Sequence, residues 1–251
     1  MRKWARVVGM AAVVAAVALG MAVHVLGPRR IPAAPGEDRW AVERERMVET
    51  TIVARGIRDK AVLEAMRSVP RHRFVPPEYL GQAYADHPLP IGYGQTISQP
   101  YIVALMTELL ALKPGDRVLE VGTGSGYQAA VLAAIGAEVY SVEIIPELAR
   151  SAAERLQALG YGQVHTAQRD GYYGWSEHAP YQGIIVTAAP DHIPQPLISQ
   201  LAEGGRLVIP VGPPGFSQVL WLIERHGSEV TSRQIAQVAF VPLTGGHSLV
   251  E

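Results

Sequence analysis

The sequence contains no cysteine among its 251 residues. This absence excludes disulfide bonds, a thiol nucleophile and any zinc site built from thiolates. The eight histidines are scattered, with no pair at the spacing of metal ligands. We therefore expect no metal site in this chain.

Neither sign of charge predominates, since 22 lysine and arginine residues balance 23 aspartate and glutamate residues. A nucleic-acid-binding protein would carry a basic surplus, and an acidic tail would need a block of carboxylates. The composition indicates neither. There are no internal repeats, and the length fits one domain with short appendages.

Long hydrophobic runs are also scarce, apart from one at the N-terminus. Val7–Leu26 is an uncharged, apolar run of 20 residues that follows Arg2, Lys3 and Arg6. At about 1.5 Å per residue, such a run reaches across a bilayer core of about 30 Å. We predict that residues 1–26 are a signal peptide or a membrane anchor.

A proline-rich linker, residues 27–36, separates this segment from the remaining domain, residues 37–251. Arginines also follow the apolar run, so the charge rule leaves its orientation open. We expect the domain to be exported or anchored to the inner membrane. In a Gram-negative source, this would place it in the periplasm.

The most informative motif is Val118–Gly126, which reads Val-Leu-Glu-Val-Gly-Thr-Gly-Ser-Gly. A strand-like segment runs into Gly122, Gly124 and Gly126, and a helical pattern follows. Such a turn places a helix N-terminus at the carboxyl edge of a sheet, where backbone N–H groups can bind a ligand closely. By itself, the pattern could also be only a tight strand-to-helix turn.

An acid at the end of the next strand strengthens the case for a ligand. Glu143 follows Gly122 by 21 residues, which suits a carboxylate that accepts both hydroxyls of a ribose. A dinucleotide fingerprint would need a third glycine at position 127, which is Tyr127. The spacing therefore favours S-adenosyl-L-methionine, which has no pyrophosphate, over a nicotinamide cofactor.

Strand and helix patterns alternate from residue 117 onward, which predicts a mostly parallel, doubly wound α/β sheet. The last two strands lack an intervening helix and predict an antiparallel hairpin. The seven expected strands are 117–121, 138–143, 163–168, 182–188, 205–211, 219–223 and 232–240. The expected helices between them are 127–135, 146–159 and 195–202. A seven-stranded sheet that ends in a hairpin is the architecture of S-adenosylmethionine-dependent methyltransferases.

The region before the sheet is predicted to be helical over residues 37–69, where Gly56 can end one helix and Asp59 can cap the next. Residues 70–99 are expected to be irregular, and a long structured loop of this kind is usually functional. A further helix is expected from Pro100.

Several segments together resemble the protein-L-isoaspartate O-methyltransferase family over about residues 40–245. They are Met66–Val75, Leu89–Pro100, Val118–Tyr127, Ile184–Pro190 and Phe240–Leu243. The glycine motif is shared by many methyltransferases, whereas Gly94-Gln-Thr-Ile-Ser-Gln-Pro100 is specific to this family.

The resemblance implies transfer of a methyl group from S-adenosyl-L-methionine to the free α-carboxylate of L-isoaspartyl residues in damaged proteins, which starts their repair. It implies that Ser98 is the catalytic residue, although a serine before a helix can also be an N-cap. Thr96 and Asp86 are expected to contact the substrate or order its loop, with structural roles as the alternative.

The resemblance also implies that the cofactor contacts Asp170 and Gly171, in addition to the glycine turn and Glu143. Family members commonly have Gly-Asp-Gly here, and this chain has Arg169 in the first position, where the side chain could crowd Asp170. Family members are usually cytoplasmic, which is the alternative location for this chain. We expect a monomer. The alternative functions are methyl transfer to a different acceptor and a tethered, non-catalytic binding module.

Overall fold

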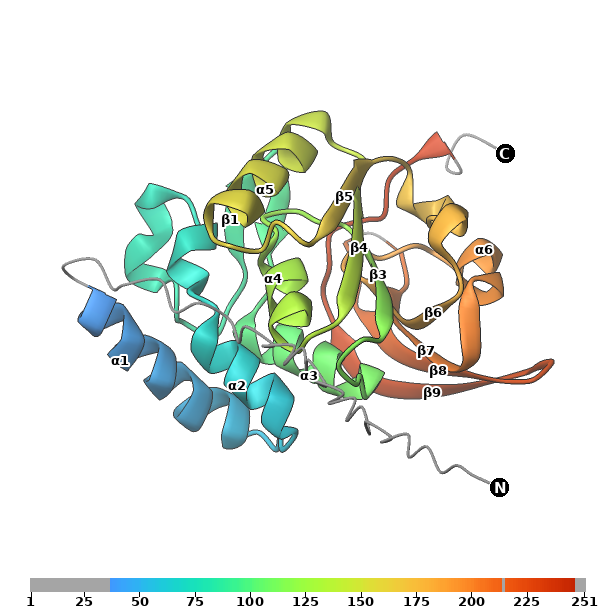
Figure 1. Ribbon diagram of the computed structural model, residues 1–251, viewed down its shortest axis with the longest axis horizontal. Helices are drawn as coiled ribbons and strands as arrows, with labels where there is room; N and C mark the ends of the chain where they lie inside the picture. Colours follow the sequence, from blue (N-terminus) through green and yellow to red (C-terminus); the bar gives the residue numbers. More distant parts are fainter. Residues whose placement is uncertain (1–36, 214, 247–251) are drawn as a thin grey trace, which may run out of the picture. The chain divides into compact units, whose positions relative to one another are not determined.

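The predicted seven-stranded sheet is present, and its strands lie in the order β5-β4-β3-β6-β7-β8-β9 (Figure 1). Five run parallel, and their segments are rich in β-branched residues that suit a buried parallel sheet. They are β3 (Arg117–Val121), β4 (Glu138–Glu143), β5 (His165–Gln168), β6 (Tyr181–Val186) and β7 (Leu201–Val211). The expected hairpin, β8 (Gln218–His226) and β9 (Glu229–Val238), completes the sheet with antiparallel pairing.

The strand order reverses at β3, which lies between β4 and β6. Val121, the last residue of β3, pairs with Val142 on one side and Val186 on the other. The loops after these strands therefore diverge and leave a crevice at the carboxyl edge, where α/β sheets bind ligands. The glycine motif lies at this crevice.

Helices cover both faces of the sheet. One face packs against α3 (Pro100–Leu110), α4 (Tyr127–Ala134) and α5 (Pro146–Ala158), and the other against the short α6 (Gln195–Ser199) and the 3₁₀ turns after β5. Pro100 begins α3, as expected, because proline lacks the N–H that a first-turn residue leaves unbonded.

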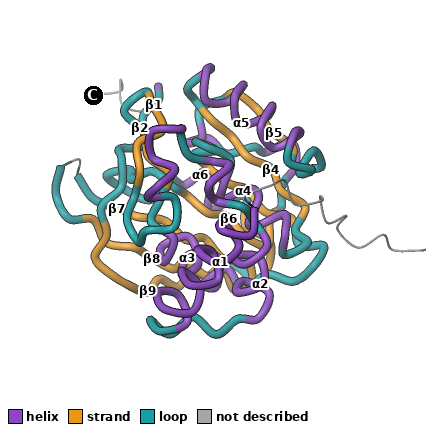
Figure 2. Tube along the Cα trace, turned by 90° about the vertical axis from the view of Figure 1, so that its left-hand side faces the viewer, coloured by secondary structure: helices purple, strands orange, loops and turns teal. Residues whose placement is uncertain are grey.

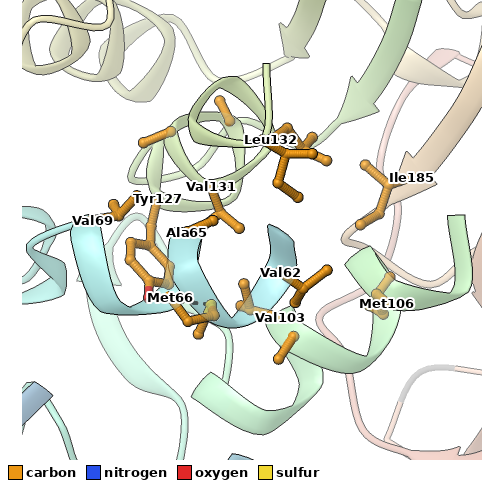
Figure 3. Packing of buried hydrophobic residues seen from close by; sticks show 14 of the residues in the cluster. Val62, Ala65, Met66, Val69, Val103, Met106, Tyr127, Val131, Leu132 and Ile185 are labelled. Carbon is orange, nitrogen blue, oxygen red and sulfur yellow. Dashed lines mark hydrogen bonds between the residues drawn. The ribbon is translucent and has the colours of Figure 1, made fainter. Parts of the chain in front are cut away.

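The N-terminal helices extend the core on the α3–α4 side. These are α1 (Glu37–Met47), continued by a π-helical turn over Val48–Val53, and α2 (Lys60–Ser68). Asp59 caps α2, as predicted, by accepting a hydrogen bond of 3.0 Å from the Val62 N–H. Buried residues of α2, α3 and α4 interlock beside Ile185 of β6 (Figure 3).

The region 70–99 is more regular than expected. It holds two 3₁₀ turns, Arg71–Phe74 and Pro77–Gln82, and a separate two-stranded sheet of β1 (Leu89–Gly92) and β2 (Gln95–Ile97) (Figure 2). The hairpin turn uses left-handed residues, with φ of 53° at Tyr93 and 70° at Gly94. Such turns match the twist of paired strands and need glycine at most of these positions.

The helix predicted over 195–202 was wrong at its end. α6 stops at Ser199, and β7 begins at Leu201 because Leu201 pairs with Tyr181 of β6. Tertiary pairing thus overrides the local helical pattern at this boundary.

The computed structural model describes residues 37–213 and 215–246. The expected signal peptide or anchor over residues 1–26 and the linker over 27–36 lie outside these residues. Within the described ranges, no helix has both the length and the apolarity needed to cross a membrane.

Candidate active site

The glycine turn after β3 has the geometry that its sequence predicted. Gly122, Gly124 and Gly126 have φ values of 96°, 53° and 87°, a region that favours glycine. At Gly122 a side chain is excluded by the positive φ and also by lack of space, because a Cβ would lie 2.4 Å from Thr187 Oγ1. The Thr187 hydroxyl instead donates to the Gly122 carbonyl at 2.7 Å and closes the turn against β6.

Glu143 ends β4, as predicted, and its carboxylate holds two loops. Oε2 accepts from the Gly124 N–H at 2.8 Å, and Oε1 accepts from the Ile145 N–H at 3.0 Å. The residue is only 6 % exposed. Each carboxylate oxygen has further acceptor capacity, so this arrangement leaves Glu143 able to accept hydroxyl groups as well.

A pocket opens beside this turn and gathers residues from distant parts of the sequence. It is lined by the hairpin, the glycine turn, the loops after β4, β5 and β6, and a C-terminal segment after β9. The lining residues are Gln95, Thr96, Val121, Gly122, Gly124, Val142, Glu143, Ile144, Ile145, Gly171, Thr187, Ala188, Val241, Pro242, Leu243 and Thr244. Glu143 is the charged residue of this set, so the pocket suits a ligand with hydroxyls and a positive centre.

A second hollow, of about 250 Å³, lies between α5 and β5, and its lining includes Thr123, Arg150, Thr166 and Gln168. It does not touch the hairpin, Glu143 or the C-terminal segment. We place the chemistry in the pocket beside the glycine turn, because the predicted residues Thr96, Gly122, Gly124, Glu143 and Gly171 line it.

The structure places Thr96 in the pocket lining and Ser98 beside it, at the end of the hairpin. The Ser98 hydroxyl has no hydrogen-bond partner among the described residues, and its side chain is half-buried. The N-cap of α3 is Gln99, whose own side chain makes no capping hydrogen bond. The alternative role of Ser98 as a helix cap is therefore wrong, and the hydroxyl is available to a ligand.

Asp86 lies outside the pocket lining and orders the segment that carries Ser98. Its carboxylate accepts from the Tyr101 N–H at 3.1 Å and from Gln99 Nε2 at 2.7 Å. It also pairs with Arg55 at 2.9 Å, and the Arg55 guanidinium stacks on the Tyr101 ring. These contacts favour the loop-ordering role that the sequence left open.

Asp170 and Gly171 follow β5 at the far side of the pocket. Asp170 accepts from the Tyr172 N–H at 3.0 Å and, with its other oxygen, from the Gly246 N–H at 2.9 Å. Gly171 lines the pocket, and a Cβ there would lie 2.3 Å from Val121 Cγ1. Packing against β3 therefore requires glycine at position 171.

Arg169 does not crowd Asp170. Its guanidinium bonds both carboxylate oxygens of Glu177, at 3.2 and 3.3 Å, and lies over the Trp175 ring. These contacts direct the side chain toward the turn after β5, so the unusual arginine is compatible with an intact Asp170.

The C-terminal segment after β9 was missed as part of the site. Ala189 bonds it on both sides, with its N–H to Val241 O and its carbonyl to the Leu243 N–H, each at 2.8 Å. Gly245 has no room for a Cβ, which would lie 2.3 Å from Asp170 Oδ2. The glycine pair Gly245-Gly246 was the available signal, but its meaning depends on Asp170, which is distant in sequence.

No group of three or more histidine, aspartate or glutamate side chains in residues 37–213 and 215–246 is arranged to hold a metal ion. The polar groups of the pocket lining are hydroxyls, the Gln95 amide, backbone N–H groups and the Glu143 carboxylate, and Asp170 precedes the lining residue Gly171.

Comparison with known proteins decides the family. The profile described as protein-L-isoaspartate(D-aspartate) O-methyltransferase (PCMT) matches residues 42–248. The chain belongs to this family. It is therefore a carboxyl methyltransferase that uses S-adenosyl-L-methionine, and the predicted family, enzyme class and cofactor are confirmed.

Curated family members are similar over most of the chain. The protein-L-isoaspartate O-methyltransferase of a Picosynechococcus species is 59% identical over 202 residues, which are 80% of this chain and 90% of the relative. That of Gloeobacter violaceus is 56% identical over 198 residues, covering 79% and 97% of the two chains.

Solved structures of the same family share the fold. A protein-L-isoaspartate O-methyltransferase matches with a TM-score of 0.74 and 30% identity, covering 80% of this chain and 66% of its own. A Plasmodium falciparum structure of that description, in complex with S-adenosyl-L-homocysteine, matches with a TM-score of 0.69 and 27% identity, covering 80% and 98%. The predicted fold class is confirmed.

Proposed function

We propose that the pocket beside the glycine turn transfers the methyl group of S-adenosyl-L-methionine to the free α-carboxylate of L-isoaspartyl residues in damaged proteins. The observation that carries this assignment is the position of the hairpin, which brings Thr96 to the cofactor turn and leaves the Ser98 hydroxyl unbonded beside it. Membership of the family supplies the acceptor class.

The residues present fit this cofactor. Gly122 and Gly124 line the pocket and present bare backbone to it, and Glu143 presents a carboxylate for the two ribose hydroxyls. We assign Asp170, beside the lining residue Gly171, to accept from the amino group of an adenine. When bound, the cofactor supplies a methyl group on a sulfonium, which is a good leaving group.

The acceptor needs no general base, because its carboxylate has a reference pKa of about 4 and is ionised at neutral pH. The protein must desolvate this carboxylate and align it with the methyl group. Positioning of this kind can contribute on the order of 7–11 kcal/mol at its extreme. Ser98 is placed to donate its hydroxyl proton to one carboxylate oxygen, and Thr96 to support the same group.

The chemistry after transfer needs no residue of the chain. The methyl ester is attacked by the neighbouring backbone nitrogen, methanol leaves, and a succinimide forms. Water then opens the succinimide to an aspartyl or an isoaspartyl residue, and repeated cycles enrich the aspartyl form.

The test is methyl transfer from labelled cofactor to two matched peptides that differ only in an aspartyl or isoaspartyl residue. We expect label in the isoaspartyl peptide alone. Equal labelling of both peptides, or of neither, would contradict the acceptor assignment.

We also propose that residues 1–26 direct export or membrane attachment, that residues 27–36 link them to the catalytic domain, and that the domain acts as a monomer. The basic flank of Val7–Leu26 supports the first point. Protease added to spheroplasts should digest the domain if it is periplasmic, whereas a soluble, protected protein would indicate the cytoplasm. Sedimentation of the purified chain tests the monomer.

A further inference from the structure

Three buried, hydrogen-bonded side chains lie beneath the cofactor turn. Glu120 on β3 pairs in register with Ser141 on β4. Its Oε2 lies 2.5 Å from Ser141 Oγ, and Ser141 Oγ lies 2.6 Å from Thr123 Oγ1. Thr123 stands between Gly122 and Gly124, so the series connects a core carboxyl to the turn itself. Glu120 and Ser141 are both 0 % exposed.

No cation balances Glu120 in this environment. Its Oε1 has no hydrogen-bond partner among the described residues. Burial, with a contribution from the nearby Glu143 charge, raises the pKa of Glu120 to about 8. Hydrogen bonds from Ser141 and from the Ala129 N–H of α4 act in the opposite direction and lower this pKa. Of the groups that face it, Glu143 on β4 is the titratable one, and α4 contributes only backbone. Burial without a balancing cation therefore favours the neutral, protonated form of Glu120.

The proton sets the direction of the hydrogen bonds. A neutral Glu120 can donate to Ser141, which can then donate to Thr123. An ionised Glu120 can only accept, so Ser141 must turn its proton toward Glu120, and Thr123 must donate to Ser141. Ionisation also places negative charges on both sides of one turn, because Glu143 accepts from the Gly124 N–H.

We propose that Glu120 is a positioning residue for the cofactor, which as a neutral acid fixes the turn of Gly122 and Gly124 through Ser141 and Thr123. Loss of its proton reverses the hydrogen bonds and weakens cofactor binding. This inference rests on the use of S-adenosyl-L-methionine and not on the identity of the acceptor. This inference can therefore fail while the acceptor assignment stands, and the acceptor assignment can fail while this inference stands.

The test measures the dissociation constant of S-adenosyl-L-homocysteine by calorimetry, without acceptor, for the full chain between about pH 6.5 and about pH 9. If only the neutral form binds well, the affinity of the unaltered chain should fall about tenfold from about pH 7 to about pH 9. Glu120→Gln removes this titration, so its affinity should vary with pH only through the amino group of the ligand and should exceed that of the unaltered chain at the alkaline end. The amino group of the ligand titrates equally in both proteins and cancels in the comparison.

Glu154→Gln is the matched control, because Glu154 is exposed on α5, away from the series. It should follow the unaltered chain at every pH. A level profile in the unaltered chain would overturn the proposal without any variant, and so would an equal fall in Glu120→Gln. If Glu120→Gln does not fold, Ser141→Ala cuts the same connection. If the affinity of Ser141→Ala then does not fall as the pH rises, the proposal is supported. A fall equal to that of the unaltered chain would overturn it.

Discussion

At the scale of single residues, the Ser98 hydroxyl has no hydrogen-bond partner among the described residues, and we have proposed that it binds the acceptor carboxylate. Replacing it, in Ser98→Ala, should lower kcat about 10- to 100-fold, since about 1.4 kcal/mol corresponds to each factor of ten. The affinity for S-adenosyl-L-homocysteine should hardly change, because the hydroxyl is assigned to the acceptor. Steady-state kinetics and calorimetry measure the two quantities separately.

Ser199→Ala is the control for that experiment, since the Ser199 hydroxyl bonds only the Pro196 carbonyl on an exposed turn. Its kcat should equal that of the unaltered chain. Normal turnover in Ser98→Ala, together with a lower melting temperature, would instead show that Ser98 has a structural role.

Glu143 combines two tasks, because it holds the Gly124 and Ile145 N–H groups and is assigned to the ribose. Hydrogen bonds to a charged group contribute about 1.5–3 kcal/mol each. Glu143→Ala should therefore raise the dissociation constant of the cofactor at least about tenfold, with a smaller loss of kcat at saturation. An unchanged affinity would show that this carboxylate does not reach the ribose.

At the scale of elements, the hairpin depends on Asp86 for its position. Asp86→Ala removes an acceptor at the start of α3 and a partner of Arg55, and the loss of such a cap costs about 0.5–2 kcal/mol of stability. We expect kcat to fall because Ser98 is displaced, while cofactor affinity holds.

A double variant separates this effect from general damage. If Asp86 acts through Ser98, then adding Asp86→Ala to Ser98→Ala should lower kcat little further, since coupled residues are not additive. Full additivity in kcat would contradict the assignment of Asp86 to the hairpin.

The C-terminal segment offers a second test at this scale. Gly245→Ala would place a Cβ against the Asp170 carboxylate and push Pro242–Thr244, which line the pocket, out of position. Cofactor affinity should fall about tenfold or more. Gly81→Ala is the matched control, because nothing lies within 4 Å of a Cβ there, and its affinity should be unaltered. Equal affinities in the two variants would show that the segment does not shape the site.

The elements that were predicted well are those whose signals are local. The cap at Asp59, the proline at the start of α3 and the glycine turn each depend on a few neighbouring residues, and all three are present. The segment at Gly245 could not be predicted in this way, because its conformation depends on contacts with Asp170, which is distant in sequence and which periodicity cannot detect. The hairpin of β1 and β2 was also missed, although its turn at Gly92, Tyr93 and Gly94 is a local signal.

The same limit applies to the chemical groups. The sequence identified Glu143 by its distance from Gly122, but not its bonds to two backbone N–H groups. It did not identify Glu120 at all, since a glutamate within a strand pattern looks like an exposed residue. Burial distinguishes Glu120, and burial follows from the packing of α4 over β3 and β4.

At the scale of the whole molecule, Glu120 links stability to pH. Because its folded-state pKa is raised to about 8 by burial, the folded protein binds a proton more tightly than the unfolded chain. The resulting stability is fully present below the usual carboxyl pKa and is lost as pH rises toward about 8, by up to about 1.4 kcal/mol per pH unit.

Scanning calorimetry can isolate this contribution. The melting temperature of Glu120→Gln, relative to that of the unaltered chain, should rise from about pH 5 to about pH 8 and then level off. A difference that stays constant over this interval would show that Glu120 is ionised in the folded protein.

The position of the pocket along the chain also affects when the enzyme can first bind its cofactor. Its lining begins with Gln95 and is complete only with Thr244. During synthesis, the glycine turn and the parallel strands leave the ribosome well before the segment that covers them. A growing chain can thus assemble its sheet but not a closed cofactor pocket, so S-adenosyl-L-methionine cannot guide the early folding of this protein and is captured only once folding is nearly finished.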